Sequence, residues 1–183
     1  MASIITATTT SGLTQSADNS GVLQLASGVG NLVTVPAVTG TAMVSGNMPA
    51  FSAFKSTPQT LSSGVATKIT FETETFDTNN NFASSRFTPT VAGYYQINAN
   101  ATLGGSDTGV AVIIYKNGSE ESRGWSVPIS GVFNACATAC KVVYLNGSTD
   151  YIESYAFQAI GSNRDINAGI SQTALSGALV RAA

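Results

Sequence analysis

The 183-residue chain contains no histidine. It therefore lacks Ser-His-Asp and Cys-His catalysis, the commonest metal ligand and the usual general base at neutral pH. A phosphate-binding glycine motif, a zinc-ligand spacing and an EF-hand loop are also absent. Paired carboxylates occur at Glu72/Glu74, on one face of an expected strand, and at Glu120-Glu121 near an expected hairpin tip. Exposed acids at such places normally serve solubility, so we expect a protein that is not an enzyme.

Charged residues are scarce, at 10% of the sequence against 43% hydrophobic residues. A free-standing monomer normally carries about a quarter charged residues on its surface. This balance favours a protein that buries much of its surface against copies of itself or within a larger assembly. The formal net charge is −2 and no cluster of Lys and Arg occurs, which argues against a nucleic-acid groove.

Long apolar runs are missing too, and no basic segment followed by a short apolar stretch marks a signal peptide. We therefore expect no insertion into a membrane. We also expect the chain to be made in a cytosol and to stay there until it is assembled into something larger.

Two cysteines are present, Cys136 and Cys140, in a segment that has the pattern of a strand. Residues four apart in a strand share a face but lie about 13 Å from each other, which is too far for a disulfide. We expect both to be small, buried hydrophobic residues.

Residues 1–47 differ from the rest of the chain, because Asp18 is the only ionisable side chain before Lys55. Alternating residues predict short strands at 22–25 and 32–35, with a Ser- and Gly-containing link between them. A disordered linker would also fit the polar, glycine-rich composition. The regular placement of leucine and β-branched residues favours an extended, β-rich arm that attaches or oligomerises by packing on neighbouring chains.

Residues 48–183 have the pattern of a single antiparallel β domain without a long helix. Expected strands include 51–54, 67–71 and 93–99, and in the last of these Tyr95 falls on the apolar side. Residues 110–115 are apolar on both faces, which predicts a strand buried from both sides. The Asn117-Gly118 pair that follows predicts a tight hairpin, and a second Asn-Gly pair stands at Asn146-Gly147.

A spaced pattern of aromatic, acidic and glycine residues resembles the signature of the complement component one-q globular head, a family of tumour-necrosis-factor-like jelly rolls. Ile97 and Ala99 stand where aromatic residues are usual in that family. The resemblance covers residues 49–183, and its signature residues are Phe71, Asp77, Phe82, Phe87, Gly93 and Tyr95.

The resemblance implies a jelly-roll sandwich that forms compact trimers through apolar strands, with loops at the tip left to bind partners. Together with the doubly apolar strand at 110–115, it predicts a homotrimer. We expect its core or three-fold seam to contain Tyr95, Val112, Ile114 and Tyr115.

Candidate partner contacts are charged or aromatic residues expected in loops. Trp125 is the lone tryptophan; it would either pack over a sheet edge or offer a stacking platform to a sugar ring. Arg123 and Arg164 carry planar donor forks that suit anionic sugars. Asp107 and Glu120 complete the set.

A resident cofactor is not expected. The one candidate is Ca²⁺, because Asp107, Asp150 and Asp165 lie in segments rich in Ser, Thr and Asn, whose oxygens could ligate it. No loop has a spacing specific for calcium.

A jelly-roll head behind a low-charge arm is similar to bacteriophage virion appendage proteins, and residues 10–18 are similar to the beginnings of phage fibre proteins. This resemblance implies a virion protein whose arm (1–47) contacts other virion proteins and whose head (48–183) projects outward. A tail fibre or receptor-binding head, contacting a host glycan or protein, is the first interpretation. A capsid decoration or cement protein is the second, and a free lectin-like binding module is the third.

Overall fold

The computed structural model describes residues 23–26, 32–35, 48–105, 109–127 and 134–183. The chain divides into two compact units, Met1–Thr41 and Ala42–Ala183. In the first unit, β1 (Leu23–Ala26) pairs antiparallel with β2 (Leu32–Val35), close to where the sequence predicts two strands. The predicted boundary between residues 47 and 48 stays a prediction, because residues 36–47 lie outside the described part.

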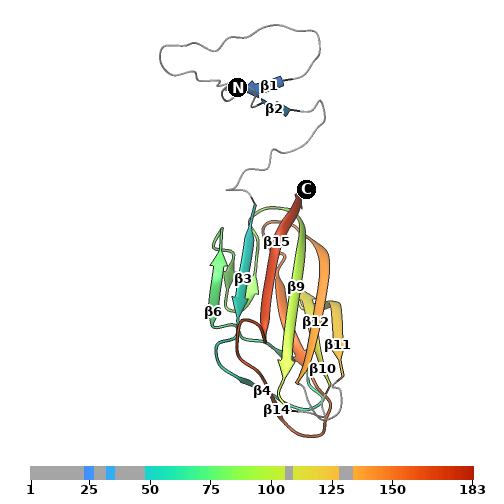
Figure 1. Cartoon of the computed structure of the whole chain (residues 1–183). Helices are drawn as coiled ribbons and strands as arrows, with labels where there is room; N and C mark the ends of the chain where they lie inside the picture. The colour runs from blue at the N-terminus through green and yellow to red at the C-terminus, as the bar shows by residue number, and fades with distance from the viewer. Residues whose placement is uncertain (1–22, 27–31, 36–47, 106–108, 128–133) are drawn as a thin grey trace. The chain divides into compact units, whose positions relative to one another are not determined.

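The described residues of the second unit form β-strands and connections, with no helix that could cross a membrane. Its strands make two antiparallel sheets (Figure 1). The first sheet has the order β4-β14-β9-β15-β3-β6, and β12 pairs with β9. Its strands are β3 (Ala50–Phe54), β4 (Gln59–Leu61), β6 (Thr73–Asp77), β9 (Gly93–Leu103), β12 (Ala135–Leu145), β14 (Arg164–Ile166) and β15 (Ala174–Ala182).

The second sheet has the order β11-β10-β13-β8-β7, and β5 pairs with β13. One apolar core, drawn from strands of both sheets, lies between them. The expected all-β sandwich is therefore present. The strands of this sheet are β5 (Thr67–Lys68), β7 (Phe82–Ala83), β8 (Arg86–Phe87), β10 (Val110–Lys116), β11 (Ser119–Ser126) and β13 (Ile152–Phe157).

The spaced aromatic residues of the sequence signature meet in this core. Phe87 stacks on Phe51 with ring centroids 4.2 Å apart and meets Tyr95 edge-on at 5.5 Å. Phe82 stacks on the same Phe51 ring at 5.1 Å. The buried Tyr95 hydroxyl donates to the carbonyl of Val91 at 2.7 Å, and burial raises the pKa of Tyr95 to about 12. The pattern thus has a physical basis, because its widely spaced members form one packed cluster.

The two Asn-Gly pairs behave differently. Asn117 and Gly118 both have positive φ (51° and 80°) and close the β10–β11 hairpin, as predicted. Asn146-Gly147 instead follows β12 of the first sheet and precedes β13 of the second. The same dipeptide there carries the chain from one sheet to the other.

The strand predicted at 67–71 is shorter than expected and ends at Lys68. Beyond it the backbone bonds partly to side chains instead of a strand ladder: the N–H of Thr70 donates to Gln59 Oε1 at 3.0 Å, and the N–H of Phe71 donates to Ser85 Oγ at 2.8 Å. Glu72 accordingly precedes β6, so Glu72 and Glu74 do not form the paired strand face that the sequence suggested.

Lys55 is a buried cation, with 1% of its side chain exposed. Its ammonium donates to Glu72 Oε1 at 2.7 Å and to the carbonyl and hydroxyl of Thr70, both at 3.0 Å. Partial burial would raise the pKa of Glu72, but hydrogen bonds from Lys55 and from the Ser56 N–H outweigh it and lower that pKa to about 2. The ion pair therefore stabilises the fold through a carboxylate that stays charged well into acid.

Glu72→Gln is expected to lower the free energy of unfolding by about 2 kcal/mol, because it leaves the buried Lys55 ammonium without its carboxylate. The figure is below the 3–5 kcal/mol typical of broken buried pairs, since a third of Glu72 is exposed. Glu74→Gln, two residues away and exposed, is the matched control and should change little.

The same pair sets an acid dependence. The folded pKa of Glu72 lies below its ordinary value of 4.5, so its stabilising contribution is complete above that pH. That contribution is lost as the pH falls from 4.5 towards 2. Urea unfolding across this range should show the difference between wild type and Glu72→Gln shrinking with acid, and a constant difference would contradict the assignment.

A candidate recognition face and an uncharged face

The outward side of β10 is covered by the chain's own side chains. Ala111 and Ile113 point away from the core cluster yet are 0% exposed. Ala111 lies between Trp125 of β11 and Phe157 of β13, and Ile113 lies between Arg123 and Tyr155. The doubly apolar pattern of this strand therefore has a cause within one chain, and it does not by itself indicate a three-fold seam.

These flanking residues, together with Tyr115, form what we call the aromatic face. The rings of Trp125 and Phe157 meet edge-on at 5.9 Å, and those of Tyr115 and Tyr155 lie 4.3 Å apart. Trp125 remains 60% exposed. An exposed indole held by a neighbouring ring is available for stacking against a flat apolar ligand.

Arg123 is fixed beside this indole. Its guanidinium lies 5.4 Å from the Trp125 ring centroid and 6.0 Å from that of Phe157. Glu120 accepts from Arg123 Nε at 2.9 Å and from Nη2 at 2.5 Å. This bidentate bond from Arg123 lowers the pKa of Glu120 and raises that of Arg123. The sequence-predicted residues Glu120, Arg123 and Trp125 thus lie together on β11.

The other predicted contacts are elsewhere. Arg164 lies on β14 of the first sheet and is exposed, and Asp107 lies outside the described residues. The expectation of loops is wrong for Arg164 and for the three residues of β11, because β11 and β14 are strands made mostly of polar residues. β11 pairs with β10, and β14 pairs with β4. Both segments therefore form strands without a regular alternation of apolar and polar residues in their own sequences.

The four residues predicted for the core or the three-fold seam lie in two different places. Tyr95, Val112 and Ile114 are fully buried within the core cluster. Tyr115 is half-buried on the aromatic face. The three core residues are therefore not available for a contact between copies of the chain. Such a contact would have to use other residues, whose side chains point outward.

Two of the three candidate calcium ligands, Asp150 and Asp165, are engaged with the protein, and Asp107 lies outside the described residues. Asp150 accepts from Asn117 Nδ2 at 2.7 Å and from Lys116 Nζ at 3.0 Å, and the first of these bonds contributes most to lowering its pKa. Asp165 lies in β14, not in a loop, and accepts from Thr60 Oγ1 at 2.6 Å. Within the described ranges, no three His, Cys, Asp or Glu side chains are grouped closely enough to hold a metal ion.

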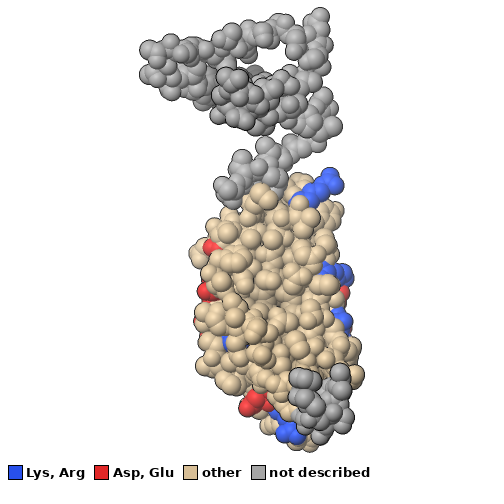
Figure 2. Space-filling model, in the orientation of Figure 1, with Lys and Arg blue, Asp and Glu red and all other residues tan. Residues whose placement is uncertain are grey.

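Apart from Arg181 at the end of β15, the outward side of the first sheet carries no charged side chain across β3, β15, β9 and β12, and we call it the uncharged face. Figure 2 shows this side, with Lys, Arg, Asp and Glu gathered around its margin. A shallow pocket of about 200 Å³ lies in it beside Ala178, Gln96 and Phe76. The outward residues include Ala50, Ser52, Tyr94, Gln96, Asn98, Asn100, Cys136, Thr138, Cys140, Val142, Tyr144, Ser176, Ala178 and Val180.

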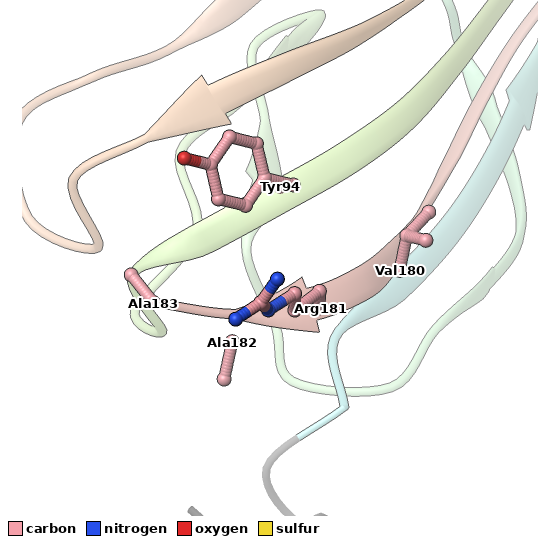
Figure 3. A pocket seen from close by; sticks show the side chains of 5 residues that line it. All are labelled: Tyr94, Val180, Arg181, Ala182 and Ala183. Carbon is pink, nitrogen blue, oxygen red and sulfur yellow. The ribbon is translucent and has the colours of Figure 1, made fainter. Parts of the chain in front are cut away.

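Several large apolar side chains of this face are open to solvent. Val142 is 50% exposed, Tyr144 42% and Val180 62%. A larger pocket of about 580 Å³ lies at the end of the face, where Tyr94 of β9 stands beside Val180 and Arg181 of β15 (Figure 3). Exposed apolar groups gathered on one side of a small protein normally mark an interaction surface.

Both cysteines lie on the uncharged face. They are unpaired and exposed, which corrects the expectation that they are buried. Within β12 it is the alanines at 135, 137 and 139 that point into the core, so the intervening positions point outward. Sequence alternation alone did not distinguish which of these two small-residue sets faces inward.

Sequence comparison finds no matching protein-family model and no matching curated protein. Comparison of structures does find relatives in fold. Murine APRIL matches with a TM-score of 0.55 at 10% identity, over 73% of this chain and 99% of that one. The globular domain of zebrafish complement 1qA protein matches with a TM-score of 0.55 at 18% identity, over 74% and 98%.

Eiger TNF from S. frugiperda matches with a TM-score of 0.55 at 7% identity, over 74% of this chain and 93% of that one. The head is therefore a jelly roll of the tumour-necrosis-factor and complement one-q kind, as the resemblance implied. At these identities the likeness concerns the fold alone.

Proposed function

We propose that this chain is a non-enzymatic structural protein of a bacteriophage virion. Its head forms a homotrimer through the uncharged face, its arm (1–47) attaches to the particle, and the head projects outward as a tail fibre or receptor-binding head. The observation that carries the proposal is the sheet-wide uncharged face with exposed apolar side chains and two thiols.

A second copy of the chain is the occupant that fits this face best. Apart from Arg181 at its end, the face has no charge to be desolvated, so its burial needs few compensating ion pairs. Free thiols and exposed valines are features that soluble monomers usually avoid. Fold relatives of this kind, as the resemblance implies, pack around a three-fold axis, and closed symmetry buries the same patch on every copy.

The arm suits attachment because it is nearly free of charge. Asp18 is its one ionisable residue, and all the other acidic and basic side chains of the chain lie in the head. A segment of this composition is readily desolvated within an assembly. The head keeps the charged and aromatic groups, including Arg123 and Trp125, that suit contact with an outside partner.

Deleting residues 1–47 tests the attachment role. We expect the truncated chain to be absent from purified particles that incorporate the full-length protein, as measured by immunoblot or mass spectrometry. Trp125→Ala should incorporate normally but reduce adsorption of the particles to host cells. Particle decoration by the arm-deleted chain at wild-type copy number would contradict the proposal.

Copy number separates the two virion positions. A protein seen in an electron-microscopy map across the capsid lattice is a decoration or cement protein. Density confined to the tail supports the fibre. Abundant trimer that never associates with particles would favour the free binding module instead.

A further inference from the structure

A second pocket, of about 540 Å³, lies on the head beside β5 and the β7–β8 turn. Lys68 and Arg86 line it, and no carboxylate does. The rest of the lining is mostly neutral side chains that can donate or accept hydrogen bonds. Those side chains belong to Asn80, Asn81, Ser84, Thr88 and Thr90.

The two cations share a single carboxylate. Glu153 Oε1 accepts from Lys68 Nζ at 2.7 Å and from Arg86 Nε and Nη2, both at 2.9 Å. Burial would raise the pKa of Glu153, but these bonds outweigh it and lower that pKa. The carboxylate is therefore charged at neutral pH, and the group of three keeps one uncompensated positive charge.

The ratio of two cations to one carboxylate in this group differs from the ratio in the other ion pairs of the described residues. Each of those pairs joins one cation to one carboxylate, whereas here two cations meet one. With so few basic residues in the chain, two placed in one pocket are a marked concentration of positive charge. The one-to-one pairs are Lys55–Glu72, Lys116–Asp150, Arg123–Glu120 and Lys141–Glu121.

The two cationic groups are held in place before any ligand arrives. The Arg86 guanidinium lies 3.8 Å above the centroid of the Tyr151 ring, and Lys68 Nζ donates to the carbonyl of Ser84 at 3.1 Å. Ser84 and Ser85 are the two central residues of the β7–β8 hairpin, and both have the positive φ that such a tight turn needs, 51° and 58°. The side chain of Ser85 accepts the Phe71 N–H bond, and the carbonyl of Ser84 accepts from the ammonium.

We propose that this pocket binds the carboxylate of an acidic sugar residue. A carboxylate matches the single excess positive charge, and Arg and Lys donors give charge-assisted hydrogen bonds to it. The neutral amides and hydroxyls of the lining match the hydroxyl groups of a sugar ring. The pocket volume lies within the range of small-molecule sites.

The inference rests on the recognition role of the head and names the class of ligand for it. Lys68 and Arg123 belong to one row across the second sheet, since Lys68 pairs with Tyr155, Tyr155 with Ile113 and Ile113 with Arg123. A glycan whose acidic residue occupies the pocket could therefore extend over the aromatic face towards Trp125.

Titration of the full-length protein with methyl glycosides tests the proposal directly. The probes are methyl glucuronide and the methyl glycoside of N-acetylneuraminic acid, and methyl glucoside is the neutral match of the first. Followed by NMR, at least one acidic probe should shift the amide signals of residues 83–90 and bind at least tenfold more tightly than the neutral one. Absence of binding by both acidic probes at millimolar concentration, or equal binding of the neutral glucoside, would overturn the proposal.

Two variants locate the binding. Arg86→Gln removes one cation while Lys68 still pairs with Glu153, and Ala83→Asp adds a carboxylate to the lining without removing any partner of Glu153. Each should weaken the binding of the acidic probe at least tenfold, whereas Ser171→Asp, an exposed position outside the lining, should not. Unchanged affinity in Ala83→Asp would overturn the proposal even if Arg86→Gln failed to fold.

Inorganic sulfate is the last probe of the experiment. Sulfate binding as tightly as the acidic glycoside would show a site for small anions without sugar recognition, and would overturn the proposal. The result is independent of the virion role: binding without particle association contradicts only the proposed function, and particle association without binding contradicts only the pocket.

Discussion

Ala178→Glu is expected to convert the proposed trimer into folded monomers. Ala178 is exposed on the uncharged face, between Gln96 of β9 and Ala50 of β3. In a monomer the new carboxylate would remain in water and leave the core untouched. In a trimer each copy would bring an unpaired charge into the interface, at a cost of roughly 3–5 kcal/mol. Multi-angle light scattering on the full-length protein should report one-third of the wild-type mass.

Ala159→Glu is the matched control, because Ala159 is an exposed alanine outside the uncharged face. This variant should keep the wild-type mass, and both variants should retain the wild-type circular dichroism spectrum. A trimeric Ala178→Glu protein would show that copies meet elsewhere on the head. A monomeric wild type would contradict the trimer altogether.

The fold could be predicted because its strongest sequence signals are local or regularly spaced. Tyr95 and Ile97 alternate with polar neighbours, and this alternation continues as buried and exposed positions along β9. The Asn117-Gly118 pair predicts its hairpin locally, because both residues adopt the positive φ that the tight turn requires. The spacing of Phe82 and Phe87 is explained only by the folded structure, because both rings pack onto Phe51.

The surfaces were harder to predict, since they depend on which strands become neighbours. Low charge indicated that the chain buries surface in an assembly, but composition cannot say that the uncharged residues gather on one sheet. The apolar pattern at 110–115 suggested a contact between chains. Its second face is instead covered from β11 and β13, with Trp125 on one side and Phe157 on the other.

The acidic-sugar pocket had no local signal at all. Glu153 is 85 residues from Lys68 and 67 from Arg86 along the chain, and a lone lysine, arginine and glutamate at such separations form no motif. Only the pairing of β13 with β5 and β8 brings them together. Likewise, nothing local distinguished the inward alanines of β12 from its outward cysteines.

A further constraint lies where the edges of the two sheets meet. Gly124 of β11 lies so close to β12 that a Cβ atom there would stand 1.8 Å from the carbonyl oxygen of Thr138 and 2.5 Å from its carbon. Side-chain bonds tie the same edges together: Ser122 Oγ donates to the carbonyl of Cys140 at 3.3 Å, and Lys141 Nζ donates to that of Glu121 at 2.8 Å. The sandwich is therefore closed on this side by direct strand-to-strand contact.

Gly124→Ala is expected to lower the free energy of unfolding by about 3 kcal/mol, the upper end of the usual effect of overpacking, because the obstacle is backbone and cannot rotate away. Gly104→Ala is the matched control, since its Cβ would lie 3.1 Å from the Asn167 Oδ1 atom, which a side-chain rotation can move. Urea unfolding should separate the two variants, and amide hydrogen exchange in Gly124→Ala should rise first along β11. Equal stability of both variants would show that β11 can move away from β12 at little cost, and the closure of the sandwich would then not depend on this glycine.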